Sequence, residues 1–224
     1  MSIEIKISLN EGIYLKDPQD SPLGRNIIKH SILLIEDVGF EAFNFKKLAQ
    51  EINSTEASIY RYFENKHALL IYLVSWYWAW VSYLIKINTM NIDDPKKKLE
   101  IIINSFVLAS MDNPSNDYVD ENKLHSIMIS EGTKAYRTKG VDEENGKGFF
   151  KNYKELITMV AGVILDIAPT FEYPYTLAST LFEMSNDQLY FAKHLPRLTD
   201  IKEKENKYAE VEKMLNYITA KLLY

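Results

Sequence analysis

Hydrophobic residues recur at helical spacing along most of the chain. In each such segment apolar side chains return every three or four positions, as one face of an amphipathic helix requires. Clusters of proline, glycine, asparagine and aspartate separate the segments. The pattern predicts an all-α protein of about nine helices, near residues 22–38, 45–52, 55–63, 68–85, 95–111, 121–137, 149–167, 174–194 and 200–223, with the polar segment 139–148 as an exposed loop.

The first twenty residues have a different period. Ile3, Ile5, Ile7 and Leu9 alternate with polar residues, which is typical of a half-buried strand. Residues 10–12 then favour a turn, after which the chain can return as a second strand. A short N-terminal β-hairpin is one interpretation of this arm, and a disordered arm is the other.

The most apolar segment, residues 68–85, contains no charged residue over 18 positions. That length is at the lower limit for a membrane-spanning helix. However, Trp76, Trp78 and Trp80 lie in its middle, whereas membrane helices concentrate tryptophan at the two interfaces. A helix that is apolar on all sides can instead be buried inside a helical domain. We therefore expect a core helix and no membrane partner.

Composition is that of an ordinary globular protein, with 46% hydrophobic and 25% charged residues and a net charge of −5. The absence of cysteine excludes disulfides and fits a cytoplasmic location, and the N-terminus shows no secretory signal. The four histidines are scattered, and neither an H-E-x-x-H nor a G-x-S-x-G motif is present. We therefore expect no catalytic residues, no metal and no cofactor.

Two short helices joined by a tight turn are predicted between Asn44 and Lys66. Asn44 can cap the first helix, and Thr55 the second. Asparagine tolerates the left-handed conformation that ends a helix, so Asn53 suits the turn. The first helix has one apolar stripe, and the second helix divides into an inward and an outward set. These sets are Phe45, Leu48, Ala49 and Ile52 in the first helix, Ala57, Ile59 and Phe63 inward in the second, and Ser58, Tyr60, Arg61 and Tyr62 outward.

This arrangement is typical of a helix-turn-helix, whose second helix enters the major groove of DNA. The segment from Arg25 to about Leu73 resembles the DNA-binding domain of the TetR-like family of bacterial transcription regulators. The run IYRYFENKHALL, at residues 59–70, carries the most specific part of the resemblance. Asn53, Ser54, Glu56 and Ala57 depart from the family pattern.

The resemblance implies a DNA-binding domain at residues 21–67, after the arm at residues 1–20. Lysines at the start of the first helix of the motif can meet phosphates, and the entry of the second helix can reach base edges. Residues 21–70 carry six basic and six acidic side chains, so this domain is neutral. The predicted DNA-binding residues are Asn44, Lys46, Lys47, Thr55, Glu56, Ala57, Ser58, Tyr60, Arg61, Tyr62 and Lys66.

For residues 68–224 the resemblance implies a helical effector-binding and dimerisation domain. Aromatic and apolar side chains with a few polar groups can line a ligand pocket, although the same stripe can simply be core. The candidates for the pocket are Trp76, Trp80, Tyr83, Phe106, His125, Met128, Tyr153 and Met159. The candidates for a seam with a second subunit, or alternatively for the core of the monomer, are Ala178, Leu181, Phe182, Ser185, Leu189 and Ala192.

The functional hypothesis is a dimeric repressor that binds a palindromic DNA operator and is released by a small-molecule effector. Two copies of the motif on a two-fold axis can read half-sites roughly 34–36 Å apart. The alternative is a lipid- or small-molecule-binding protein on the same scaffold that does not bind DNA. Glu56 and the neutral domain favour the alternative, whereas Lys46, Lys47 and the intact IYRYFENK favour the repressor.

Overall fold

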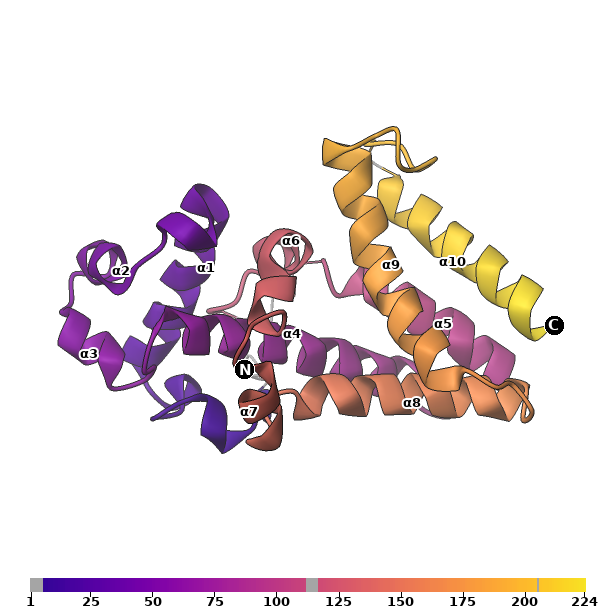
Figure 1. The fold of residues 1–224 in the computed structure, drawn as a ribbon, viewed down its shortest axis with the longest axis horizontal. Helices are drawn as coiled ribbons and strands as arrows, with labels where there is room; N and C mark the ends of the chain where they lie inside the picture. Colours follow the sequence, from indigo (N-terminus) through magenta and orange to yellow (C-terminus); the bar gives the residue numbers. More distant parts are fainter. Residues whose placement is uncertain (1–5, 112–116, 205) are drawn as a thin grey trace. The chain divides into compact units, whose positions relative to one another are not determined.

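The computed structural model describes residues 6–111, 117–204 and 206–224. Within these ranges the chain is helical and contains no strand, which confirms the all-α prediction. Ten α-helices are accompanied by three short 3-10 helices, Glu11–Ile13, Pro18–Asp20 and Gly132–Ala135. The α-helices are α1 (Pro22–Ala42), α2 (Phe45–Glu51), α3 (Glu56–Tyr60), α4 (Lys66–Asn88), α5 (Pro95–Leu108), α6 (Glu121–Glu131), α7 (Val141–Gly146), α8 (Lys151–Ile167), α9 (Pro174–His194) and α10 (Lys207–Leu223) (Figure 1).

Helix boundaries follow from capping residues that the sequence supplies. Ser21 precedes α1, and its side chain accepts a hydrogen bond from the Gly24 amide at 3.1 Å, while Pro22 occupies the first turn. At the other end, Gly39 has a φ of +75°, a conformation that glycine adopts without steric cost. The helix predicted to stop at Gly39 does break there, and one further turn follows to Ala42.

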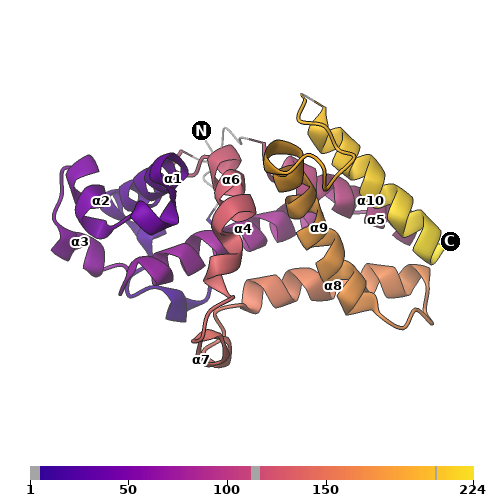
Figure 2. The ribbon, with the colours of Figure 1, turned by 45° about the horizontal axis from the view of Figure 1, so that its top comes forward.

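Packing divides the chain into two compact units. Unit 1 comprises Met1–Ala79 and Ser110–Asn152, and unit 2 comprises Trp80–Ala109 and Tyr153–Tyr224. Within unit 1, α1 packs against α6 (Figure 2). Ile27, Ile28, Ile32 and Ile35 are fully buried there, because their spacing places them on one side of α1.

In unit 2, α10 packs along both α9 and α5 (Figure 1). The ring of Phe106 on α5 meets that of Phe182 on α9 edge to face, with centroids 5.3 Å apart. Val211 and Leu215 of α10 are fully buried, as their spacing of four residues predicts. The apolar stripes of these helices therefore form one core.

Helix α4 is the apolar helix that the sequence singled out. It is long and apolar enough to cross a membrane, yet 72% of its most apolar window is buried inside the protein. Trp76, Trp78 and Trp80 are each only 1% exposed. Helix α4 is therefore a core helix, as expected from the position of its tryptophans.

Three sequence expectations are wrong in detail. The described part of the arm does not form a hairpin: residues 6–10 have no strand assignment, and Glu11–Ile13 is a 3-10 helix, while Ile3 and Ile5 lie outside the described residues. The segment 139–148, predicted as a loop, contains the short helix α7. The last helix begins at Lys207 and not near residue 200.

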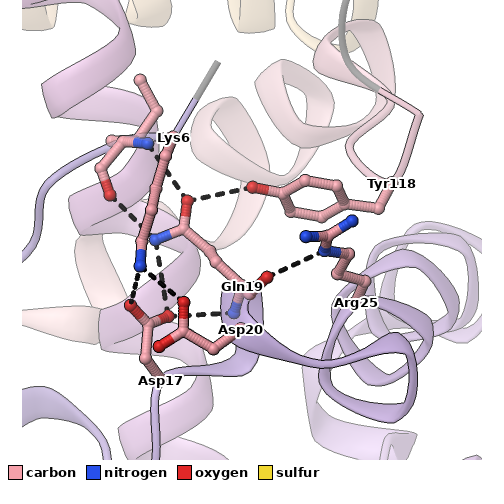
Figure 3. A network of polar contacts seen from close by, with 7 residues as sticks. Lys6, Asp17, Gln19, Asp20, Arg25 and Tyr118 are labelled. Carbon is pink, nitrogen blue, oxygen red and sulfur yellow. Dashed lines mark hydrogen bonds and ion pairs between the residues drawn. The ribbon is translucent and has the colours of Figure 1, made fainter. Parts of the chain in front are cut away.

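The arm packs on unit 1 through a buried glutamine. The amide of Gln19 donates to the Ile7 carbonyl at 2.8 Å and accepts from the Ile7 backbone N–H at 3.1 Å, so it pairs with Ile7 as a neighbouring strand would. The Tyr118 hydroxyl donates to the same amide oxygen at 3.0 Å, and Lys6 forms ion pairs with Asp17 and Asp20 (Figure 3). A side chain thus satisfies the backbone groups that the predicted hairpin was expected to pair.

Candidate nucleic-acid interface

The turn between α2 and α3 has the geometry of a helix-turn-helix. The Asn44 side chain caps α2 by accepting from the Lys47 amide at 2.9 Å. Asn53 adopts the left-handed conformation, with φ of +50°, and Ser54 N–H donates to the Ala49 carbonyl at 2.8 Å. Thr55 then caps α3 by accepting from the Ser58 amide at 3.2 Å. The caps and the turn predicted from sequence are therefore present.

The inner side of this motif is packed against the rest of unit 1. Leu48 on α2, Ile59 on α3 and Phe63 just after α3 are fully buried. The ring of Phe45 meets that of Tyr60 edge to face, with centroids 5.0 Å apart. These contacts fix the orientation of α3 relative to α2, and so fix which side chains of α3 face outward.

We call seven of the predicted DNA-binding side chains, all exposed on or beside α2 and α3, the recognition face: Lys46, Lys47, Thr55, Glu56, Ala57, Tyr60 and Arg61. Asn44, beside Lys46, is also exposed, and Ser58 is half-buried. The expectation that Ala57 faces inward is wrong, and its exposure leaves its methyl group available to a partner.

Charges of both signs lie on the recognition face. Lys46, Lys47 and Arg61 are the basic residues, and Lys47 also donates from Nζ to the Ala42 carbonyl at 2.9 Å. Glu56 is the acidic residue, and it occupies the first turn of α3. A carboxylate at a helix N-terminus is stabilised by the helix dipole. Glu56 therefore has a structural reason to be there, although it opposes a polyanion.

Tyr62 is not on the outer surface, contrary to the sequence interpretation. Only 4% of it is exposed, and its hydroxyl makes a hydrogen bond of 2.7 Å with Ser21 Oγ. Helix α3 ends at Tyr60, so the helical spacing of α3 no longer sets the direction of the Tyr62 side chain. The pattern Tyr-Arg-Tyr gives no signal that distinguishes the two tyrosines.

Lys66 is engaged inside the domain. Its ammonium donates to the carbonyls of Phe40, Glu41 and Phe43 at 3.0, 3.1 and 3.3 Å. A lysine has three N–H donors, so all of them are used by the chain that leaves α1. In this arrangement Lys66 ties the start of α4 to the end of α1 and has no donor left for a phosphate.

Comparison with known proteins agrees with this geometry. The sequence model of a family described as bacterial regulatory proteins, tetR family, matches residues 27–73, which run from the second turn of α1 into α4. The match includes the capped turn and all seven residues of the recognition face. These residues form a TetR-family domain.

Solved structures extend the likeness to most of the chain. FadR from Bacillus halodurans, a fatty acid degradation regulator, aligns with a TM-score of 0.64 and 17% identity over 89% of this chain and 95% of that one. A putative tetR family transcription regulator from Shewanella sp. PV-4 aligns at 0.60 and 14% over 91% and 97%. AibR, solved in complex with isovaleryl coenzyme A and operator DNA, aligns at 0.57 and 15% over 89% and 98%.

At these identities the structural matches show the fold. The chain therefore has the all-helical fold of TetR-family transcription regulators. No curated protein matches its sequence.

The residues predicted to bind an effector fall in both units of this TetR-like chain. Trp76, His125 and Met128 are buried in unit 1, and Trp80, Tyr83, Phe106, Tyr153 and Met159 belong to unit 2. Several of them pack as ordinary aromatic core. His125 stacks on Tyr77 with ring centroids 5.6 Å apart, and Tyr83 stacks on Trp80 at 5.5 Å.

Two pockets open in unit 1, one beside residues 12–15 and one beside residues 22–29, and neither is lined by any of the eight effector candidates. The effector assignment remains a prediction. The first pocket was missed at the sequence level because its residues come from three separate segments.

The six residues predicted for a seam with a second subunit do not lie on the surface of α9. Ala178, Leu181, Phe182, Ser185, Leu189 and Ala192 are all at most 5% exposed in the single chain. They form the core of unit 2, which is the alternative that the sequence left open. Any contact with a second copy must use other side chains.

Proposed function

We propose that this protein is a TetR-type transcriptional repressor that binds a palindromic operator as a homodimer and releases it when a small-molecule effector binds. The observation that carries the proposal is the recognition face. Its seven exposed side chains lie on or beside α2 and α3, which are joined by a turn with Asn53 in the left-handed conformation and are capped by two side chains. A short helix held rigidly on an inner helix is how this motif places side chains against base edges.

Each part of the recognition face has a distinct expected role. Lys46, Lys47 and Arg61 are expected to contact phosphates, which position the protein without reading sequence. Ala57 and Glu56 lie at the start of α3, where they can meet a thymine methyl group and a cytosine amino group. Tyr60 is 47% exposed, with its ring packed on Phe45, and is also expected to contact a phosphate.

The homodimer is proposed from symmetry and from exposed apolar residues on α10 and directly after it. One recognition face reads one half-site, so a palindrome requires two faces on a two-fold axis. Tyr217, Leu222 and Tyr224 are each more than half exposed. We expect a second copy to cover them. We also propose a cytoplasmic location, where a protein that binds a bacterial chromosome would act.

The effector is proposed from the fold. AibR, a protein of this fold, was solved with both isovaleryl coenzyme A and operator DNA. This supports the idea that one chain of this fold contains both a ligand site and a DNA-binding site. The chemical class of the effector of the present protein is left to experiment.

The test is selection of bound sequences from random duplex DNA with the purified full-length protein. The expected result is a palindromic consensus, and sedimentation should show a dimer that binds it. A double variant, Lys46→Ala with Arg61→Ala, should lose the enrichment while keeping its thermal unfolding midpoint.

Failure to enrich any sequence at low salt would contradict the proposal. It would favour the alternative, a small-molecule- or lipid-binding protein on this scaffold. The exposed Glu56 on the recognition face is the observation that favours this alternative.

A further inference from the structure

A pocket of about 180 Å³ opens in unit 1 where three segments far apart in the sequence meet. Its lining comes from the arm at residues 12–15, from residues 64–71 around the start of α4, and from residues 140–149 around α7. The volume corresponds to roughly six waters at their share of liquid volume. A compact organic molecule therefore fits.

One part of the pocket is apolar and well fixed. Ile13 from the arm and Ile71 from α4 are at most 2% exposed, and Phe149 lies beside them. Asn10 holds the arm in place here, because its side-chain amide donates to the carbonyls of Lys147 and Gly148 at 3.2 and 2.8 Å. The apolar lining suits a hydrocarbon group.

The polar part of the pocket carries excess negative charge. Glu64, Glu143 and Glu144 line it, and Lys147 is the one lysine or arginine that does so. Lys147 Nζ lies 2.6 Å from Glu143 Oε1, which leaves two carboxylates uncompensated by lysine. His67 Nε2 lies 2.9 Å from Glu144 Oε1. Even with this histidine protonated, one negative charge remains.

Two further observations indicate that the carboxylates of this pocket can stabilise a positive charge. The hydrogen bond from Glu143, with its charge, raises the pKa of Lys147, and the charges of Glu64 and Glu144 add to the effect. In addition, Glu144 Oε2 is buried and finds no hydrogen-bond partner among the described residues. The carboxylates of this pocket therefore already stabilise one ammonium group, that of Lys147.

We propose that this pocket is a binding site for a compact organic cation, an amine or amidine carried on a small apolar group. Carboxylates favour a cation by direct charge interaction, and the buried isoleucines favour the attached hydrocarbon. A bare metal ion is disfavoured, because the described residues contain no group of three or more His, Asp or Glu side chains placed to hold one. Anions are opposed by the net charge.

The site is separate from the residues predicted to bind an effector, and it does not depend on the proposed function. Its wall includes Glu64 and Asn65, the link that directly follows α3 and its last turn. Asn65 Oδ1 accepts from the Ala68 amide at 2.9 Å and so caps the start of α4. Although this wall lies close to α3, binding of an organic cation to the pocket can be measured without DNA.

The experiment titrates the full-length protein with three probes of one shape: 2-phenylethylamine, 2-phenylethanol and phenylacetate. Calorimetry at low ionic strength is expected to show saturable binding of the amine, with at least tenfold weaker binding of the alcohol and none of the acid. Equal binding of the three probes would overturn the proposal, because it would show that charge does not select the occupant.

Variants assign the binding to this pocket. Glu144→Gln should weaken the amine about tenfold and Glu64→Gln about threefold, since Glu64 is more exposed to solvent. Lys147→Met should tighten binding about threefold, because it removes the competing internal cation. The matched control is Lys97→Met, which breaks an exposed Lys97–Glu100 pair of 2.9 Å in unit 2 and should change nothing.

Amine binding that is the same in Glu64→Gln, Lys147→Met and the wild type would refute the site. These two substitutions change exposed side chains, so the test stands even where Glu144→Gln lowers stability. A protein that binds the amine in this pattern but selects no DNA sequence would contradict the proposed function and still support the amine site.

Discussion

Two helical surfaces of this protein were expected to contact partners, but one is exposed and the other is buried. On and beside α2 and α3, eight of the predicted DNA-binding residues are exposed, and a capped turn joins the two helices. On α9, all six of the predicted subunit contacts are buried in unit 2. The difference follows from composition. The α3 face contains polar and charged residues, whereas the α9 stripe is mainly apolar and is covered by neighbouring helices of the same chain.

The largest expected effect breaks the α9 core. Leu181→Ala should lower the free energy of unfolding by about 2–5 kcal/mol, because it leaves a cavity where a leucine is fully buried. Thr180→Ala, at the exposed neighbouring position, should change it by less than about 0.5 kcal/mol. Urea unfolding followed by circular dichroism measures both. Similar small effects for the two variants would mean that Leu181 is not core.

The second effect separates Lys66 from the lysines of the recognition face. Lys66→Met should destabilise the protein by about 1.5–3 kcal/mol, since hydrogen bonds from a charged donor to three carbonyls are lost. Lys86→Met, at an exposed position late in α4, serves as the control in the same urea unfolding series. An unchanged unfolding midpoint for Lys66→Met would show that the ammonium is free for another partner.

The third effect is on DNA binding alone. Lys46→Ala should reduce the slope of log K against log salt by about one and weaken binding on the order of tenfold near 0.1 M salt, because one phosphate contact is lost. Fluorescence anisotropy over a salt titration measures the slope. Stability should stay that of the wild type, in contrast to Lys66→Met. A full wild-type slope in Lys46→Ala would remove Lys46 from the interface.

The smallest effect compares two tyrosines, one buried and one on the recognition face. The Tyr72 hydroxyl is buried and has no hydrogen-bond partner among the described residues, so Tyr72→Phe should stabilise the protein by about 1 kcal/mol. Tyr60→Phe, at a half-exposed position, should leave stability unchanged. A loss of stability in Tyr72→Phe would reveal a partner for the hydroxyl.

The same tyrosine predicts a dependence on pH. Burial raises the pKa of Tyr72 well above its ordinary value, so its neutral form is favoured in the folded state. The unfolded phenol ionises near pH 10. The contribution of Tyr72 is therefore full below about pH 10 and is lost as the pH rises further. The wild type should lose more stability above pH 10 than Tyr72→Phe does.

The sequence by itself determined the helical class, most helix boundaries and the capped turn. These are local properties: Ser21 and Pro22 start α1, Gly39 breaks it, and Asn53 ends α2, each through interactions within a few residues. The apolar, tryptophan-rich α4 was also identified as core from its composition alone. The family resemblance, from Arg25 to about Leu73, was also found in one local segment, and the family model matches residues 27–73.

The tertiary structure alone decided which of two similar side chains faces outward and which segments meet. Tyr60 and Tyr62 look alike in the sequence, yet one is exposed and the other bonds to Ser21, 41 positions away. The arm pairs with a glutamine side chain and not with a second strand, and Glu64 reaches the same pocket as Glu144. Periodicity places a residue on a face of its own helix, but what covers that face depends on distant parts of the chain.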